Sequence, residues 1–239
     1  MVLNARRIDH LKLILLVIED VTEARRTAVQ QKILLGEAQH RVKNLLMTVR
    51  ALSQLMVQSS SSLEAFAESF DARLEAMART QDLLVHEPGS SALLHEIVRL
   101  ELDAIGAGED STCSLNGPPL RLSGRASHAF AMTLHELATN AGKYGALSKE
   151  AKNGRVEITW GTHAVDGGNA ELHFRWREYG LSAPPHQNKS GFGTQMIESS
   201  LPYLFGGSST LEFHKDGIEC IINVKLPSAE LSTQRGNQA

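Results

Sequence analysis

The sequence has few cysteines, and their spacing is not that of a disulfide framework or a metal site. Its 239 residues include two, Cys113 and Cys220, which lie far apart without a Cys-x-x-Cys pair or a nearby histidine pattern. A disulfide framework and a structural zinc site are therefore not expected. The pattern indicates buried thiols in a reducing compartment.

Long apolar runs are also missing. The longest, Leu11–Ile18, is interrupted by Lys12 and is far too short to span a bilayer. It also lacks the small-residue cleavage site of a signal peptide. We therefore expect a soluble, cytoplasmic chain with no membrane span.

Charge of one sign is scarce as well. The 24 Lys and Arg residues nearly balance the 27 Asp and Glu residues, which leaves a formal net charge of -3. Such a chain has no broad field to attract nucleic acid or anionic lipid, so we expect no nucleic-acid partner. Hydrophobic residues, at 42% of the chain, are enough to bury a core in one or two domains.

Helix-breaking residues are nearly absent from Val21 to Met56, where Gly36 is the one glycine and no proline occurs. This stretch favours a long helix. A second helical stretch runs from about 63 to 85, after the short polar segment 58–62. Two helices with so short a connection should be antiparallel neighbours, which predicts a helical hairpin.

The second helix carries one apolar stripe, because its large apolar residues recur at intervals of three and four. These residues are Leu63, Phe66, Phe70, Leu74, Met77 and Leu84. The hairpin therefore has a face to bury, either on itself or in a dimeric four-helix bundle.

The composition changes after Glu87-Pro88-Gly89. Segments with the hydrophobic pattern of a helix and segments with that of a strand both follow. We expect helices over 92–105, 127–144 and 193–204, and strands around Cys113 and over 156–160, 170–176, 211–213 and 219–226. Helices that cover one face of a mostly antiparallel sheet form an α+β arrangement. The polar residues from 229 to 239 are expected to be a disordered tail.

The first twenty residues have a different character. The run Leu11–Ile18, closed by Glu19-Asp20, reads as a buried strand, and a lone strand needs partners to cover both faces. Its flanks, 4–8 and 18–23, resemble the last strands of a PAS sensor domain. The alternative is a free-standing N-terminal strand of the folded body.

The first candidate site lies in the long helix, at Gln39-His40-Arg41-Val42-Lys43-Asn44. With roughly 100° between successive residues, His40 lies roughly 160–170° from the centre of the apolar stripe. The helix therefore presents His40 to solvent, flanked by Lys43 and Asn44. A neutral imidazole on a rigid exposed face can act as a nucleophile toward phosphorus.

The second candidate lies on the helix over 127–144. Phe130, Leu134, Leu137 and Ala141 define its buried side, and the opposite side carries Glu136, Asn140 and Lys143. A glutamate and an asparagine one turn apart offer two hard oxygen ligands for Mg²⁺, and the lysine offers a positive charge for phosphates. An ordinary solvated polar face remains the alternative.

The third candidate combines a strand end and a glycine-rich turn. Trp176-Arg177-Glu178 ends a strand, and the Glu178 carboxylate can accept a hydrogen bond from an exocyclic amine such as that of adenine. Gly191-Phe192-Gly193-Thr194 leads into a helix, whose N-terminus favours phosphate.

The order and spacing of these motifs closely resemble the HWE histidine kinases over roughly residues 34–226. That family takes its name from a histidine in the asparagine-bearing helix and from a Trp-x-Glu motif. The matching residues here are His135, Trp176 and Glu178.

The resemblance implies a sensor histidine kinase core that uses ATP and Mg²⁺. His40 would be the phosphoacceptor, Asn140 would hold Mg²⁺ with the help of Glu136, and Glu178 would read adenine. Further nucleotide-contacting residues would be His135, Lys143, Tyr144, Trp176, Gly180, Gly191, Phe192, Gly193 and Thr194. A response regulator would be the partner, and the hairpin would form a homodimer.

The resemblance also implies a domain order. Residues 1–22 would be the remnant of a PAS-like domain, 23–87 the hairpin, and 88–228 an α/β sandwich of the Bergerat ATP-binding type, as in GHKL ATPases. The chain departs from the family at Gly180-Leu181-Ser182, where Gly-Gly-Pro is usual. This departure leaves open a phosphotransfer or scaffold module with an inactive ATP domain. A GHKL ATPase that hydrolyses ATP to drive a conformational cycle is a further alternative.

Overall fold

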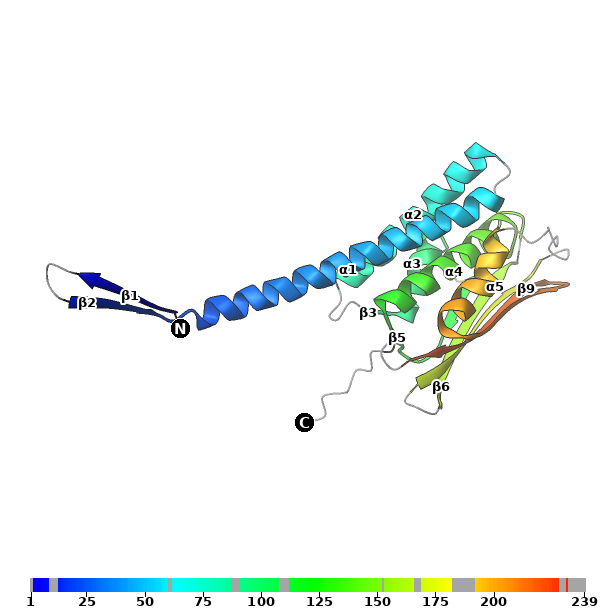
Figure 1. The fold of residues 1–239 in the computed structure, drawn as a ribbon. Helices are drawn as coiled ribbons and strands as arrows, with labels where there is room; N and C mark the ends of the chain where they lie inside the picture. The colour runs from blue at the N-terminus through cyan, green and yellow to red at the C-terminus, as the bar shows by residue number, and fades with distance from the viewer. Residues whose placement is uncertain are drawn as a thin grey trace. The chain divides into compact units, whose positions relative to one another are not determined.

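The structure is a computed structural model, shown in Figure 1. It describes residues 2–8, 13–59, 62–86, 91–107, 112–151, 153–165, 169–181, 192–227 and 231. The chain divides into two compact units, Met1–Gln54 and Leu55–Ala239. The predicted tail over 229–239 (Leu231 apart), the Pro88-Gly89 break and Gly191 lie outside the described residues.

The first unit begins with a two-stranded antiparallel hairpin of β1 (Val2–Ile8) and β2 (Leu13–Glu19). The predicted strand is therefore present from Leu13 onward, and β1 is a partner that the periodicity did not reveal. Helix α1 (Thr22–Ser59) follows, as predicted from the lack of helix breakers. Its start is capped by Asp20, whose Oδ1 accepts the Thr22 N–H at 2.9 Å.

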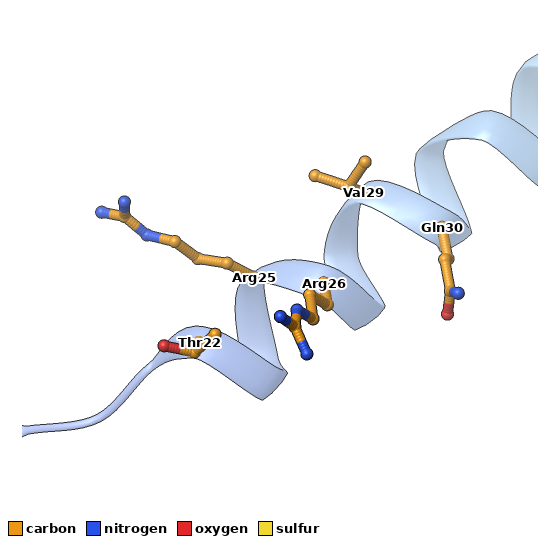
Figure 2. Close-up of a pocket in the computed structure, with 5 residues that line it drawn as sticks. All are labelled: Thr22, Arg25, Arg26, Val29 and Gln30. Carbon is orange, nitrogen blue, oxygen red and sulfur yellow. The ribbon is translucent and has the colours of Figure 1, made fainter. Parts of the chain in front are cut away.

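An open hollow lies along the first turns of α1 (Figure 2). It is lined by Thr22, Arg25, Arg26, Val29 and Gln30, all of them exposed. Because one helix supplies every lining residue, the hollow does not bring distant parts of the sequence together. None of the predicted site residues lines it.

The second unit contains the remaining helices and two sheets. The helices are α2 (Leu63–His86), α3 (Leu94–Ala104), α4 (Gly124–Lys143) and α5 (Phe192–Phe205). The strands are β3 (Ser91–Leu93), β4 (Cys113–Asn116), β5 (Arg121–Ser123), β6 (Arg155–Val165), β7 (Asn169–Tyr179), β8 (Gly207–His214) and β9 (Gly217–Leu226).

The main sheet has five strands in the order β4-β6-β7-β9-β8. Only the β4–β6 pair is parallel, and the other three pairs are antiparallel. Helices α3, α4 and α5 lie on one face of this sheet (Figure 1). The α+β class and the mostly antiparallel sheet are therefore confirmed.

Two differences from the expected elements lie near α3. Residues Ser91–Leu93 form β3, which pairs with β5, so the helix predicted from 92 begins at Leu94 instead. Strands of three residues are too short to show a periodic pattern. Helix α4 begins at Gly124, earlier than predicted, because the Ser123 hydroxyl accepts the Ala126 N–H.

The core lies between α4 and the sheet. Phe130 of α4 meets Phe174 of β7 edge-on, with ring centroids 6.1 Å apart. Trp176 and Ile197 are buried in the same cluster, and so is Cys220, whose thiol pKa burial raises to about 12. The expectation of a buried thiol is confirmed for Cys220, whereas Cys113 is only half-buried.

Helix α2 packs against α3 and α4. Met77 and Leu84 of the predicted stripe are buried, whereas Leu63 remains exposed. The sequence led us to expect the hairpin itself or a second copy as the cover for this face. Helices α3 and α4 contact α2, and the buried positions of α2 include Arg73 and Thr80.

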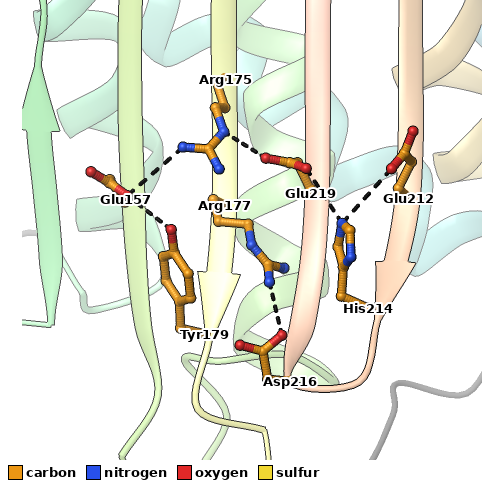
Figure 3. A network of polar contacts seen from close by, with 8 residues as sticks. All are labelled: Glu157, Arg175, Arg177, Tyr179, Glu212, His214, Asp216 and Glu219. Carbon is orange, nitrogen blue, oxygen red and sulfur yellow. Dashed lines mark hydrogen bonds and ion pairs between the residues drawn. The ribbon is translucent and has the colours of Figure 1, made fainter.

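The other face of the sheet carries a ladder of charged side chains (Figure 3). Arg175 lies between Glu157 and Glu219, and Arg177 binds Asp216 at 2.8 Å. These side chains alternate along β7 with Phe174 and Trp176, which enter the core. The polar ladder therefore keeps the uncovered face hydrophilic, away from the predicted site.

Among the described residues, no helix is long and apolar enough to cross a membrane.

Candidate functional site

Glu178 lies near the end of β7 on the side of the strand that faces the helices, and it is 1% exposed. Its Oε2 accepts the backbone N–H of Ala146 at 2.8 Å, and its Oε1 accepts the indole N–H of Trp176 at 3.2 Å. Trp176 is itself core. Its second role is to hold the carboxylate two residues later on the same face of the strand.

The turn after α4 is built around this carboxylate. A Cβ atom at Gly145 would overlap Oε2 of Glu178 and would lie 2.8 Å from Cα of Ala141. Only glycine allows the turn to approach so closely, and the approach brings the Ala146 N–H to the carboxylate. The sequence motifs named Glu178 but not Gly145 or Ala146.

Burial raises the pKa of the Glu178 carboxyl above its ordinary value. The hydrogen bonds from Ala146 and Trp176, together with the charge of Arg177, oppose this rise. The Glu178 carboxylate is thus a hydrogen-bond acceptor shielded from water. The N–H groups of Ala146 and Trp176 stabilise its charge. A ligand amine would find a strong acceptor there.

Glu136, in the middle of α4, is buried rather than solvated. Its Oε1 lies 2.7 Å from Nη2 of Arg73, and both side chains are 7% exposed. The expectation of an open polar face over Glu136 is therefore wrong, because α2 covers this side of α4. No pattern within α4 could reveal a cover that comes from another helix.

The second oxygen of Glu136 faces the start of α5. A Cβ atom at Gly193 would lie 2.6 Å from Oε2 of Glu136 and 3.9 Å from Nδ2 of Asn140. The glycine therefore lets the first turn of α5 approach both side chains. Thr194 is half-buried beside it, while the side chain of Phe192 lies outside the described residues.

Asn140 is half-buried, and Lys143 and Tyr144 are exposed at the C-terminal end of α4. Asn140 and Lys143 thus occupy the partly open side that the helical spacing predicted. Burial raises the pKa of Glu136, and the charges of Arg73, His135 and Lys143 oppose that rise. The cations around Glu136 come from two helices, α2 and α4.

His135 faces α3 and not the group around Asn140. Its Nδ1 lies 3.0 Å from Oε2 of Glu101, which also accepts a hydrogen bond from Arg79 of α2 at 2.9 Å. Glu101 is 1% exposed. One carboxylate therefore ties together α2, α3 and α4. Sequence reasoning did not select Glu101, although a glutamate among the buried apolar positions of α3 was a visible signal.

Gly180 follows β7 with φ of +85°, a backbone conformation that favours glycine. A Cβ atom there would also overlap the backbone of Asn153. The next residue, Leu181, donates its N–H to the Asp216 carbonyl at 3.0 Å, and Ser182 lies outside the described residues. The glycine of the unusual Gly-Leu-Ser segment thus has a structural requirement of its own.

His40 lies in α1 of the first unit, so its prediction as a helical residue is confirmed. Its side chain is outside the described residues, as is that of Asn44. The phosphoacceptor role of His40 stays a prediction.

The described residues fit a metal–nucleotide in their chemical type. A carboxylate in a glycine-built cradle at Glu178 fits an amine, while Asn140 and Lys143 supply an amide oxygen and a cation. Glu136 fits less simply, because Arg73 already occupies one of its oxygens.

Comparison with known families gives a direct match. Residues 37–119 match the family model described as HWE histidine kinase. This part of the chain is therefore similar to the HWE histidine kinases. It includes His40, α2 and α3, whereas the motif residues His135, Trp176 and Glu178 lie beyond it.

Similar curated proteins include the blue-light-activated histidine kinase of Brucella anthropi. It is 29% identical over 211 residues, which are 88% of this chain and 42% of that protein. The blue-light-activated histidine kinase of Brucella ovis is 29% identical over 215 residues, which are 90% of this chain and 43% of that protein. The chain thus spans less than half the length of these relatives.

Among solved structures, the histidine kinase domain of the blue-light activated histidine kinase from Erythrobacter litoralis EL346 superposes with a TM-score of 0.48. Its sequence identity is 14%, and the alignment covers 84% of this chain and 94% of that one.

Proposed function

We propose that this chain is the kinase core of a sensor histidine kinase, which transfers the γ-phosphoryl group of ATP to its own His40. One observation carries the proposal. Glu178, buried between the Trp176 and Ala146 N–H groups, lies at the turn that ends α4, the helix of Glu136 and Asn140. An acceptor for adenine and ligands for its phosphates would thus share one site.

In the proposed reaction, bound Mg²⁺ supplies neutralising charge for the triphosphate. Glu178 accepts the adenine amine, Asn140 offers its carbonyl oxygen to the metal, and Lys143 faces the phosphates. A ring nitrogen of His40 forms a bond to the γ-phosphorus while the bond to the bridging oxygen breaks, and ADP leaves. Phosphoryl transfer of this kind asks for positioning and charge more than for acid–base chemistry.

We propose the same domain order that the sequence suggested. Residues 1–22 would be the remnant of a PAS-like domain, 23–87 the phosphoacceptor hairpin, 88–228 a Bergerat-type ATP-binding domain, and 229–239 a tail. The β1–β2 hairpin supports the first assignment, because two strands alone bury too little to be stable. A cytoplasmic response regulator would receive the phosphoryl group on an aspartate.

Incubating the purified chain with γ-labelled ATP and Mg²⁺ tests this function. We expect acid-labile label on the protein. In a separate binding measurement, we expect Asn140→Ala to lose at least roughly tenfold in Mg-dependent ATP affinity, because the replacement removes a proposed metal ligand. Free phosphate alone would identify an ATPase. A chain that binds nucleotide without forming either product would be a scaffold. Unchanged affinity in Asn140→Ala would refute its metal role.

We also propose that α1 pairs with a second copy of the chain. Val42 is 55% exposed and Leu46 is 64% exposed, one turn apart on the helix, with Val29 and Ile33 exposed in the same way nearer its start. An apolar helical face left in water is a common mark of an interface. Light scattering should therefore give twice 26.1 kDa. Val42→Lys with Leu46→Lys should give the monomer mass, and a monomeric parent would contradict the pairing.

A further inference from the structure

Arg73 reaches from α2 into the group of residues assigned above to the metal and the phosphates. Its Nη2 lies 2.7 Å from Oε1 of Glu136, and its Nη1 donates to the Ser69 carbonyl of its own helix at 2.9 Å. Arg73 is 6% exposed. The guanidinium is therefore held at both ends and shielded from water.

Arg73 already occupies one oxygen of the buried Glu136 carboxylate. Arg73 binds Oε1, and Oε2 faces the start of α5, where a Cβ atom at Gly193 would lie 2.6 Å from it. A cation already satisfies the carboxylate, and burial makes that pairing difficult to share with a second cation. A metal and Arg73 therefore compete for the charge of the same buried carboxylate.

We propose that Arg73 belongs to the nucleotide site and forms a latch with Glu136, so that α2 docking and Mg-nucleotide binding exclude each other at this carboxylate. The proposal rests on the proposed function, because it takes Glu136 to assist the metal. When a Mg-nucleotide is bound, Arg73 gives up Glu136 and the middle of α2 loosens from α4.

A second ion pair limits how far α2 can loosen. Arg79, six residues after Arg73, binds Glu101 of α3 at 2.9 Å, and Glu101 has no role in holding the metal. The segment before Arg79 should respond to the ligand, while the segment after it, with buried Thr80 and Leu84, should stay docked. The latch thus predicts a response confined to one half of a helix.

Amide hydrogen exchange over α2 tests the latch, with Mg-ADP compared against ADP in EDTA. Coupled sites typically change one another's equilibria by about fivefold or more. We therefore expect amides over 66–76 of the unchanged chain to exchange about fivefold faster with Mg-ADP, and those over 80–86 to be unaffected. Arg73→Gln should exchange quickly under both conditions. Arg79→Gln, the matched control, should keep the response to Mg-ADP.

Calorimetry of Mg-ADP binding to the same unchanged chain separates the possible failures. Clear binding with unaltered or slower exchange over 66–76 would overturn the latch and make the Arg73–Glu136 pair a static anchor. The latch is also overturned if Arg79→Gln loses the response as fully as Arg73→Gln. If the unchanged chain does not bind Mg-ADP, the proposed function itself fails, and the latch with it.

Discussion

Replacing His40 with glutamine should abolish the acid-labile label that the chain takes from γ-labelled ATP. A glutamine amide has no lone pair nucleophilic enough to form the bond that an imidazole nitrogen forms with phosphorus. Glutamine is a good helix former, so α1 should persist. Filter binding of the label with acid and base treatment measures this loss.

The same variant should bind ATP as tightly as the parent. The residues proposed to read the nucleotide, among them Glu178 and Asn140, belong to the second unit, whereas His40 belongs to the first. His95→Gln is the matched control, because His95 is a partly exposed helical histidine whose Nε2 accepts a hydrogen bond from Arg99. Label that survives in His40→Gln but disappears in His95→Gln would move the acceptor to α3.

Replacing Glu178 with alanine should cost both nucleotide affinity and stability. In the complex, the adenine amine would lose its buried acceptor, at a cost of about 1–3 kcal/mol, or roughly tenfold to a hundredfold in affinity. Guanine presents a carbonyl at the same place, so the preference for ATP over GTP should narrow. Competition binding of the two nucleotides measures the change, and a preference kept in full would exclude Glu178 as the adenine reader.

The stability loss has a separate cause. The Ala146 N–H and the Trp176 indole N–H both donate to Glu178, and alanine would leave two buried donors unpaired, at about 1–3 kcal/mol each. Trp176→Phe isolates one of them, because it keeps most of the ring in the core but lacks the N–H. Urea unfolding of the two variants should place Trp176→Phe between the parent and Glu178→Ala.

Glu178→Gln adds a dependence on pH. Burial raises the folded-state pKa of this carboxyl above its unfolded value. The stability that the carboxyl contributes is therefore fully present below its unfolded pKa and is lost as the pH rises through the folded pKa. Glutamine does not titrate. The free energy of unfolding of the variant, relative to the parent, should thus increase as the pH rises above the ordinary pKa of a glutamate carboxyl. A constant difference would contradict the raised pKa.

The long elements could be read from the sequence because local patterns determine them. The lack of helix breakers predicted α1 to within a few residues, and the turn at Lys215-Asp216 with its flanking apolar runs predicted the β8–β9 pair. The short pair β3–β5 was missed, since its formation depends on a partner 30 residues away and not on any period of its own.

The motif residues could likewise be found from their spacing. Trp176 and Glu178 lie next to each other on one face of β7, and the Trp176 indole N–H donates a hydrogen bond to Glu178. What spacing could not decide was the environment of Glu136. Its helix has an apolar and a polar side, yet α2 covers the polar side at Glu136. This is possible because a buried arginine can satisfy a buried carboxylate where water otherwise would.

The sequence by itself determined the α+β class, the order of the elements and the residue types available for a nucleotide site. These follow from periodicity, turn chemistry and helical spacing, which act over a few neighbouring residues. Only the tertiary structure decided the partners of three buried carboxylates. Arg73 pairs with Glu136, and both Arg79 and His135 contact Glu101. The Ala146 N–H, which Gly145 allows to come close, donates to Glu178. A buried charge takes its partner from whatever the packing brings near, and packing joins residues that no local pattern connects.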